Sequence, residues 1–204
     1  MAQLKSLEID KQVWGEKGNP FLVHQVVVKE LSSRRQGNSK VKSRHEVAGS
    51  TRKIYRQKGT GNARHGDIKA PLFVGGGQAF GPKPRDWSYV LPRKIRKGGL
   101  RAVILQRKLE EKLWLLENLD WQTPKTKLAA QFFAGAKITS GLVVVEGTDQ
   151  MAERAIRNLA RFAVRRWEDV SVADILKYEN LILTQGAYQQ LTRRLVQGEK
   201  ERVA

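Results

Sequence analysis

Residues 141–147 read GLVVVEG, a run of four large apolar side chains between two glycines. A run that is this short and wholly apolar is typical of a β-strand buried on both faces of a sheet. Residues 114–116 and 181–183 repeat the pattern, and residues 162–166 form a shorter candidate. The sequence therefore predicts about four strands in the core of the fold.

Helical patterns separate these strands. Asn19-Pro20 is typical of an N-cap followed by proline at the first helical position, and it predicts a helix over about 20–35, although the β-branched run 26–28 leaves a strand possible there. Further helices are expected over 93–112, after Thr123-Pro124, after Asp149, from Ser171 to Leu176 and around 188–195, with a short N-terminal strand or hairpin within 4–14. Alternating strands and helices imply a three-layer α/β domain with a mostly parallel sheet.

The charge of the chain is concentrated in one segment. The 204 residues include 38 Lys and Arg against 20 Asp and Glu, a formal net charge of +18. Residues 34–108 hold 20 of the basic and three of the acidic side chains, which is a net charge of +17. A net charge this high points to a polyanionic partner, and because nearly all of it lies in residues 34–108, we expect the partner to bind there.

Composition also excludes several classes of protein. The absence of Cys excludes a disulfide framework and any Cys-ligated metal. No apolar run approaches the roughly 18 residues that a membrane span needs, and the first residues lack the apolar core of a signal peptide. We therefore expect a soluble intracellular protein without membrane contact.

The basic segment differs in kind from the rest of the chain. It holds eleven of the 18 glycines, and residues 34–70 have few large apolar side chains, so we expect it to be disordered alone and ordered on a partner. A solvated linker is the alternative, but aromatic side chains alternate with Lys and Arg here, a mixture that stacks on bases while neutralising phosphates. These aromatic residues are Tyr55, Phe73, Phe80, Trp87 and Tyr89. We predict one α/β domain over 1–204, with 38–92 as a long, basic, Gly-rich extended loop inserted between two helices.

No enzyme motif is complete. The chain has no Gly-Lys dipeptide, which excludes a Walker A loop, and residues 59–64 lack the third glycine of a dinucleotide fingerprint. The only histidines are His24, His45 and His65, and three acidic residues in the basic segment are too few for a metal-dependent nuclease. We expect no catalysis, no cofactor and no metal, and we expect Asp67 and Asp86 to cap or pair with neighbouring Arg.

Several motifs are more specific. They are HQVVV at 24–28, YRQKGTGNARHG at 55–66, KAP at 69–71, GGG at 75–77, FGPKPR at 80–85 and TPKTK at 123–127. Together they resemble the bacterial and organellar form of the ribosomal protein L4 family, from about residue 20 to the C-terminus. Asn62 stands where that family usually has Arg, and His65 and Asp67 vary around the tip.

The resemblance implies a globular domain on the outer surface of the large ribosomal subunit, and a loop threaded into large-subunit rRNA. It also implies that the loop tip helps form a constriction of the nascent-peptide exit tunnel; by position, the tip residues are Gln57, Lys58, Gly59, Thr60, Gly61 and Arg64. The implied partners are large-subunit rRNA, other large-subunit ribosomal proteins and the nascent peptide, without a homo-oligomer. The implied location is the cytoplasmic ribosome, or the plastid stroma for an organelle-encoded chain.

Basic side chains of both arms and of the loop base are expected to neutralise rRNA phosphates, and Arg56 and Arg64 to stack or form bidentate pairs. For Lys58 the alternative is a solvated tip charge, and for residues 93–97 it is a polar helix face. The predicted rRNA-binding residues are Arg44, Arg52, Lys53, Arg56, Gln57, Lys58, Gly59, Thr60, Gly61, Arg64, Lys69, Lys83, Arg85, Arg93, Lys94, Arg96 and Lys97. Two other functions remain open: an RNA-processing or modifying enzyme, and a general DNA-binding protein.

Limited proteolysis of the free protein tests the expected disorder. We expect cleavage between about Lys40 and Arg93, with both flanking fragments surviving as one noncovalent core, because a segment that buries little apolar surface stays open to proteases. Mass spectrometry of the fragments and size-exclusion chromatography of the nicked protein check this. Full resistance of the segment would contradict the argument.

Overall fold

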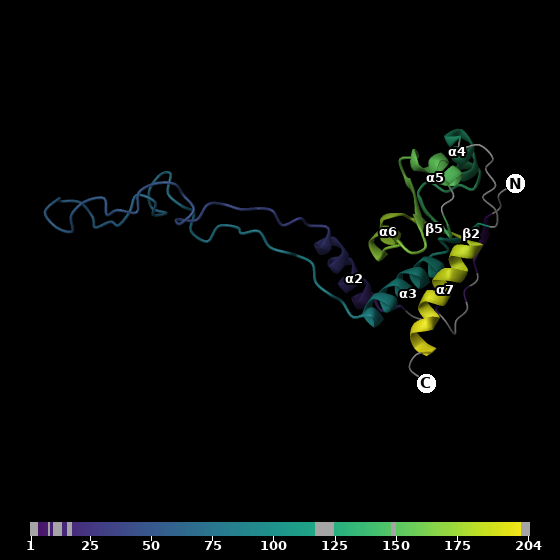
Figure 1. Ribbon diagram of the computed structural model, residues 1–204. Coiled ribbons are helices and arrows are strands. Elements are labelled where there is room, and N and C mark those ends of the chain that lie inside the picture. Colours follow the sequence, from purple (N-terminus) through teal and green to yellow (C-terminus); the bar gives the residue numbers. More distant parts are fainter. Residues whose placement is uncertain are drawn as a thin grey trace. The chain divides into compact units, whose positions relative to one another are not determined.

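The computed structural model describes residues 4–7, 9, 14, 15, 18–116, 125–147 and 150–200. The chain divides into two compact units. The first comprises residues 1–32 and 89–204, and the second comprises residues 33–88. Nearly all regular secondary structure belongs to the first unit, whereas the second is drawn as irregular chain (Figure 1).

The first unit is built on one sheet. Its strands are β1 (Leu4–Ser6), β2 (Leu113–Leu116), β3 (Gly141–Val145), β4 (Phe162–Arg166) and β5 (Asn180–Thr184), in the order β1-β2-β5-β3-β4. All neighbours are parallel except β1, which pairs antiparallel with β2. The mostly parallel sheet is confirmed, but the sheet has five strands and not about four. The fifth strand, β1, lies within the short N-terminal strand or hairpin expected over 4–14; it has only three residues and is defined by its pairing with β2.

Six helices accompany the sheet in the described part of the chain. They are α2 (Pro20–Ser33), α3 (Arg93–Leu109), α4 (Thr126–Gly135), α5 (Gln150–Arg157), α6 (Val172–Lys177) and α7 (Gln185–Lys200). The predicted N-cap of α2 is confirmed, since the Asn19 side-chain oxygen accepts from the Phe21 N–H at 2.9 Å. Ser171 caps α6 by accepting from the Asp174 N–H at 3.0 Å. The caps predicted at Thr123-Pro124 and Asp149 lie outside the described residues.

Each face of the sheet carries its own apolar cluster. Val144 and Leu183 belong to the cluster formed with α2, α3, α6 and α7, while Val143 and Ile182 belong to the cluster formed with α4 and α5. Successive side chains of a strand point to opposite faces, so the apolar run of β3 supplies both clusters. This arrangement is the three-layer α/β domain expected from the sequence (Figure 1).

Helices α2 and α3 approach each other at a double glycine, Gly98-Gly99, in the first turns of α3. A methyl group on Gly99 would lie 2.8 Å from Cγ2 of Val26 and 3.2 Å from the carbonyl oxygen of Leu22. Glycine lowers helix stability, but here it makes room for the backbone and side chains of α2. The glycines therefore fix where α2 packs.

Replacing Gly99 by Ala tests this contact against a matched glycine. We expect Gly99→Ala to lower the free energy of unfolding by about 1–3 kcal/mol because the added methyl overpacks the α2–α3 contact. Gly135→Ala, at a helix position with nothing within 4 Å of the added methyl, should raise it by about 0.5–1 kcal/mol. Urea denaturation of the full chain measures both. An equal gain from both substitutions would show that α2 and α3 are not in tight contact.

Candidate nucleic-acid interface

The second unit is a loop whose two arms are joined by backbone hydrogen bonds. No residue of 34–92 is helical or in a strand. The bonds between the arms run from the Arg85 N–H to Gly37 at 3.2 Å, from Val41 to Pro82 at 3.2 Å, from Gln78 to Lys42 at 2.9 Å and from Ile54 to Gly66 at 2.9 Å. These bonds set which residues of the outgoing arm face which residues of the returning arm.

The tip of the loop lies between Ile54 and Gly66. Gly59 has φ +81° and Gly61 has φ +69°, in the left-handed region that favours glycine. Arg56 folds back on the turn, its Nη2 donating to the Gly59 carbonyl at 3.0 Å. The segment predicted as the tip is therefore a tight glycine turn.

All three carboxylates of the second unit already have partners within it. Asp67 is buried and accepts from Nε and Nη2 of Arg44 at 3.2 and 3.0 Å. Asp86 accepts from the backbone and hydroxyl of Ser88, both at 2.8 Å, and these bonds lower the pKa of Asp86. Asp67 thus pairs with an arginine as expected, whereas the hydrogen bonds of Asp86 come from Ser88.

Glu46 is the third carboxylate. It accepts from the Ser43 N–H at 2.9 Å and lies 2.9 Å from Nζ of Lys40. The Ser43 backbone bond, followed by the Lys40 side chain, lowers the pKa of Glu46 from 4.5 to about 2. Residues 33–88 contain thirteen Lys and Arg against these three acids. Most of the positive charge of the unit therefore has no internal counter-charge.

Several aromatic rings of the basic segment have internal contacts. Trp87 lies between two guanidinium groups, with Cζ of Arg35 at 3.8 Å and Cζ of Arg85 at 3.5 Å from its ring centroid. The Tyr55 hydroxyl donates to the Ala63 carbonyl, and Phe73 packs edge-on against His65 with 5.1 Å between centroids. Phe80, which has φ +51°, is fully exposed and is the most accessible aromatic ring of the basic segment.

The predicted rRNA-binding residues fall into groups that differ in accessibility. Lys69 is only 9% exposed, and Lys53 donates to the His65 carbonyl at 2.9 Å. Arg44, Arg56 and Arg85 make the contacts given above. Within residues 33–88, all of which are described, the exposed cations without a hydrogen bond, ion pair or ring contact from their side chains include Arg52, Lys58, Arg64 and Lys83.

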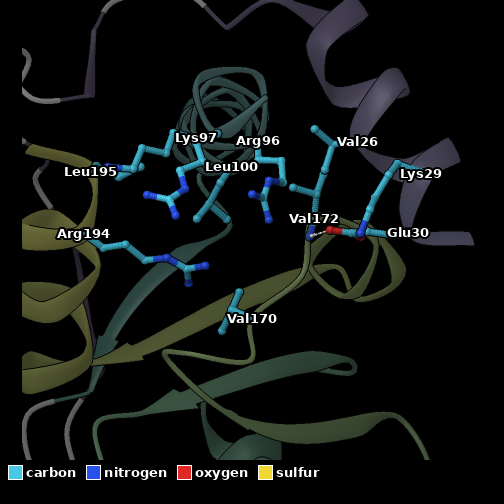
Figure 2. A pocket seen from close by; sticks show the side chains of 11 residues that line it. Val26, Lys29, Glu30, Arg96, Lys97, Leu100, Val170, Val172, Arg194 and Leu195 are labelled. Carbon is cyan, nitrogen blue, oxygen red and sulfur yellow. Dashed lines mark hydrogen bonds between the residues drawn. The ribbon is translucent and has the colours of Figure 1, made fainter. Parts of the chain in front are cut away.

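Four further predicted rRNA-binding residues lie in the first turns of α3, in the first unit: Arg93, Lys94, Arg96 and Lys97. Arg93, Arg96 and Lys97 line a cavity of about 320 Å³, whereas Lys94 does not. Lys29 of α2 and Arg194 of α7 complete the cationic lining (Figure 2). Neither residue was predicted from the sequence, because both lie in nearly neutral parts of the chain and only the fold brings them to the start of α3.

Two hydrogen-bonded groups shape this cavity. The Glu30 carboxylate, from α2, accepts from the backbone N–H groups of Val172 at 3.2 Å and Ala173 at 2.9 Å, at the start of α6. Arg194 Nη1 donates to the carbonyls of Trp167 and Glu168, both at 3.3 Å. The one carboxylate of the lining is thus directed at a helix terminus, and one of its cations is held in place.

Among the described residues, no three His, Asp or Glu side chains gather in a way that would hold a metal ion. No described helix is both long enough and apolar enough to span a membrane.

Comparison with known proteins identifies a family. The model of the ribosomal protein L4/L1 family matches residues 7–194. Three bacterial relatives carry the name large ribosomal subunit protein uL4: that of Thermus thermophilus is 44% identical over 179 residues, 87% of each chain. The Desulfatibacillum aliphaticivorans protein is 40% identical to this chain over 95% of this chain and 94% of its own length. The Oceanobacillus iheyensis protein is 38% identical over 90% of this chain and 89% of its own length.

Proposed function

The chain belongs to the ribosomal protein L4/L1 family, and on that premise we propose that it is a structural, non-enzymatic constituent of the large ribosomal subunit. Its location is then the ribosome, and its partners are rRNA and other ribosomal proteins. The observation that carries this proposal is the charge of the second unit, where thirteen basic side chains accompany three carboxylates that already have partners. An RNA backbone supplies the missing negative charge.

The second unit suits folded RNA better than an unstructured anion. Its arms are held in register by backbone bonds, so its exposed cations have defined spacings along both arms. Phe80 adds an exposed ring beside these cations, which suits stacking on an unpaired base. The family assignment favours this function over an RNA-modifying enzyme or a general DNA-binding protein.

The tip of the loop is proposed to line the nascent-peptide exit tunnel. The resemblance of residues 55–66 to the family's loop supports this, as does the tight turn at Gly59 and Gly61. A glycine turn is narrow, and Lys58 and Arg64 are exposed on it together with Gln57, while Thr60 is half-buried. Such a tip presents polar and cationic groups to whatever passes it.

A charge-matched pair of triple variants tests RNA binding. Arg52→Gln, Lys58→Gln and Arg64→Gln together remove three exposed loop cations, and we expect weaker binding to a folded rRNA fragment and a salt dependence shallower by about 2–3 in log–log slope. The control, Lys127→Gln, Arg154→Gln and Arg157→Gln, removes the same charges from exposed positions of the first unit. Filter binding over a salt series measures both variants.

Two results would contradict this assignment. Equal losses in the two triple variants would show that net charge, and not the loop, determines binding. Equal affinity of the unaltered protein for the rRNA fragment and for duplex DNA, in competition at moderate salt, would favour a general DNA-binding protein.

A photo-crosslinker in place of Lys58 tests the position of the tip. In ribosomes that carry a stalled nascent chain, we expect crosslinks from residue 58 to rRNA and to the nascent peptide, because a tip lining the tunnel lies within reach of both. The same group in place of Lys127 is the control and should give no crosslink to the peptide. Crosslinks to rRNA without any to the peptide would place the tip away from the tunnel.

A further inference from the structure

We propose that the cavity between α2, α3, α7 and the connection from β4 to α6 is a nucleotide-binding site. It takes one nucleotide unit, with the phosphate at a cationic rim and the base or ribose on an apolar floor. The site lies entirely in the first unit, so it is separate from the loop that carries the proposed function. An unpaired nucleotide of RNA and a free nucleotide share this chemistry.

The rim of the cavity is strongly cationic. Lys29, Arg93, Arg96, Lys97 and Arg194 supply five positive charges from three different helices. Among the described residues that line the cavity, Glu30 is the only carboxylate, and both of its oxygens accept backbone N–H groups of α6. Like charges around one small cavity repel each other, and a bound phosphate relieves that repulsion while accepting charge-assisted hydrogen bonds.

Arg194 is already positioned for such a bond. Its Nη1 atom is held by the carbonyls of Trp167 and Glu168, and no described residue accepts a hydrogen bond from its other two nitrogens. Figure 2 shows the side chains of Arg96 and Arg194 extending from α3 and α7 toward the space above Val170. A planar guanidinium fixed at one edge suits a phosphate better than a mobile side chain does.

The floor of the cavity explains why a nucleotide fits better than inorganic phosphate. It is made of the buried side chains of Val26, Leu100, Val170, Val172 and Leu195, all 7% exposed or less. A bare phosphate gains nothing from apolar surface, whereas a base or ribose does. The volume of about 320 Å³ is near the lower end of the roughly 300–1,000 Å³ typical of small-ligand sites. There is room for one nucleotide and not for a duplex.

The test uses the full chain, adenosine monophosphate as the probe, and two double variants. Arg96→Gln with Arg194→Gln removes two cations of the rim. Lys108→Gln with Arg193→Gln removes the same charge from positions on the same helices that neither line the cavity nor belong to the predicted rRNA-binding residues. By isothermal titration calorimetry, we expect the first pair to weaken AMP binding by at least about tenfold, and the control pair to change it by less than about twofold. Circular dichroism establishes that both variants are folded.

A second arm distinguishes the sources of the nucleotide. A single-stranded RNA oligonucleotide containing 4-thiouridine is crosslinked to the unaltered protein and to both double variants, and the crosslinked peptides are mapped by mass spectrometry. Crosslinks to α2, α3 or α7 that disappear only in the rim variant identify an RNA nucleotide as the ligand, whether or not AMP binds. Rim-dependent AMP binding without such crosslinks identifies a free nucleotide.

Three outcomes would overturn the inference. They are equal losses in the two double variants, inorganic phosphate competing as well as AMP itself, and neither saturable AMP binding at millimolar concentration nor crosslinks at the cavity. None of these affects the loop, because the triple variant of Arg52, Lys58 and Arg64 tests RNA binding there independently. Failure of the nucleotide site and failure of the proposed function are therefore distinguishable.

Discussion

The contact between α2 and α3 is the interaction on which the rest of the structure depends. The chain enters the second unit from the end of α2 and returns from it to the start of α3, so these two helices hold both ends of the loop. The absence of a side chain at Gly99 sets the approach of Leu22 and Val26, and Glu30 ties the other end of α2 to the start of α6. The same placement of α2 brings Lys29 and Val26 to the nucleotide cavity.

The two units are stabilised in different ways. In the first, strands buried on both faces and their helices form two apolar clusters, and the charge is nearly balanced outside α3. In the second, backbone bonds, the pairing of Arg44 with Asp67 and the stacking of Trp87 between two arginines replace an apolar core. These contacts set the register of the arms, but they leave the excess positive charge to be neutralised by a partner.

Local signals in the sequence predicted much of this fold. The apolar run of β3 and the Asn19 cap each depend on neighbouring residues alone, and both were found where expected. The edge strand β1 was harder, because three residues carry no period and their conformation comes from β2. Arg194 could not be assigned to the cavity, since its partners on α3 lie about a hundred residues earlier and only tertiary packing unites them. The internal stacking of Trp87 was likewise not foreseen, because sequence spacing does not show that Arg35 and Arg85 meet.

The position of β5 in the sheet has a consequence for synthesis. This strand lies between β2 and β3 and pairs with both, yet among the described residues it is the last strand in sequence order and is followed by α7. Until residue 184 has been added, β1 with β2 and β3 with β4 are two halves without their shared neighbour. Because a domain generally folds as a unit, this sheet cannot be completed until its central strand β5 has been synthesised. The basic loop is made long before the domain that anchors it is complete.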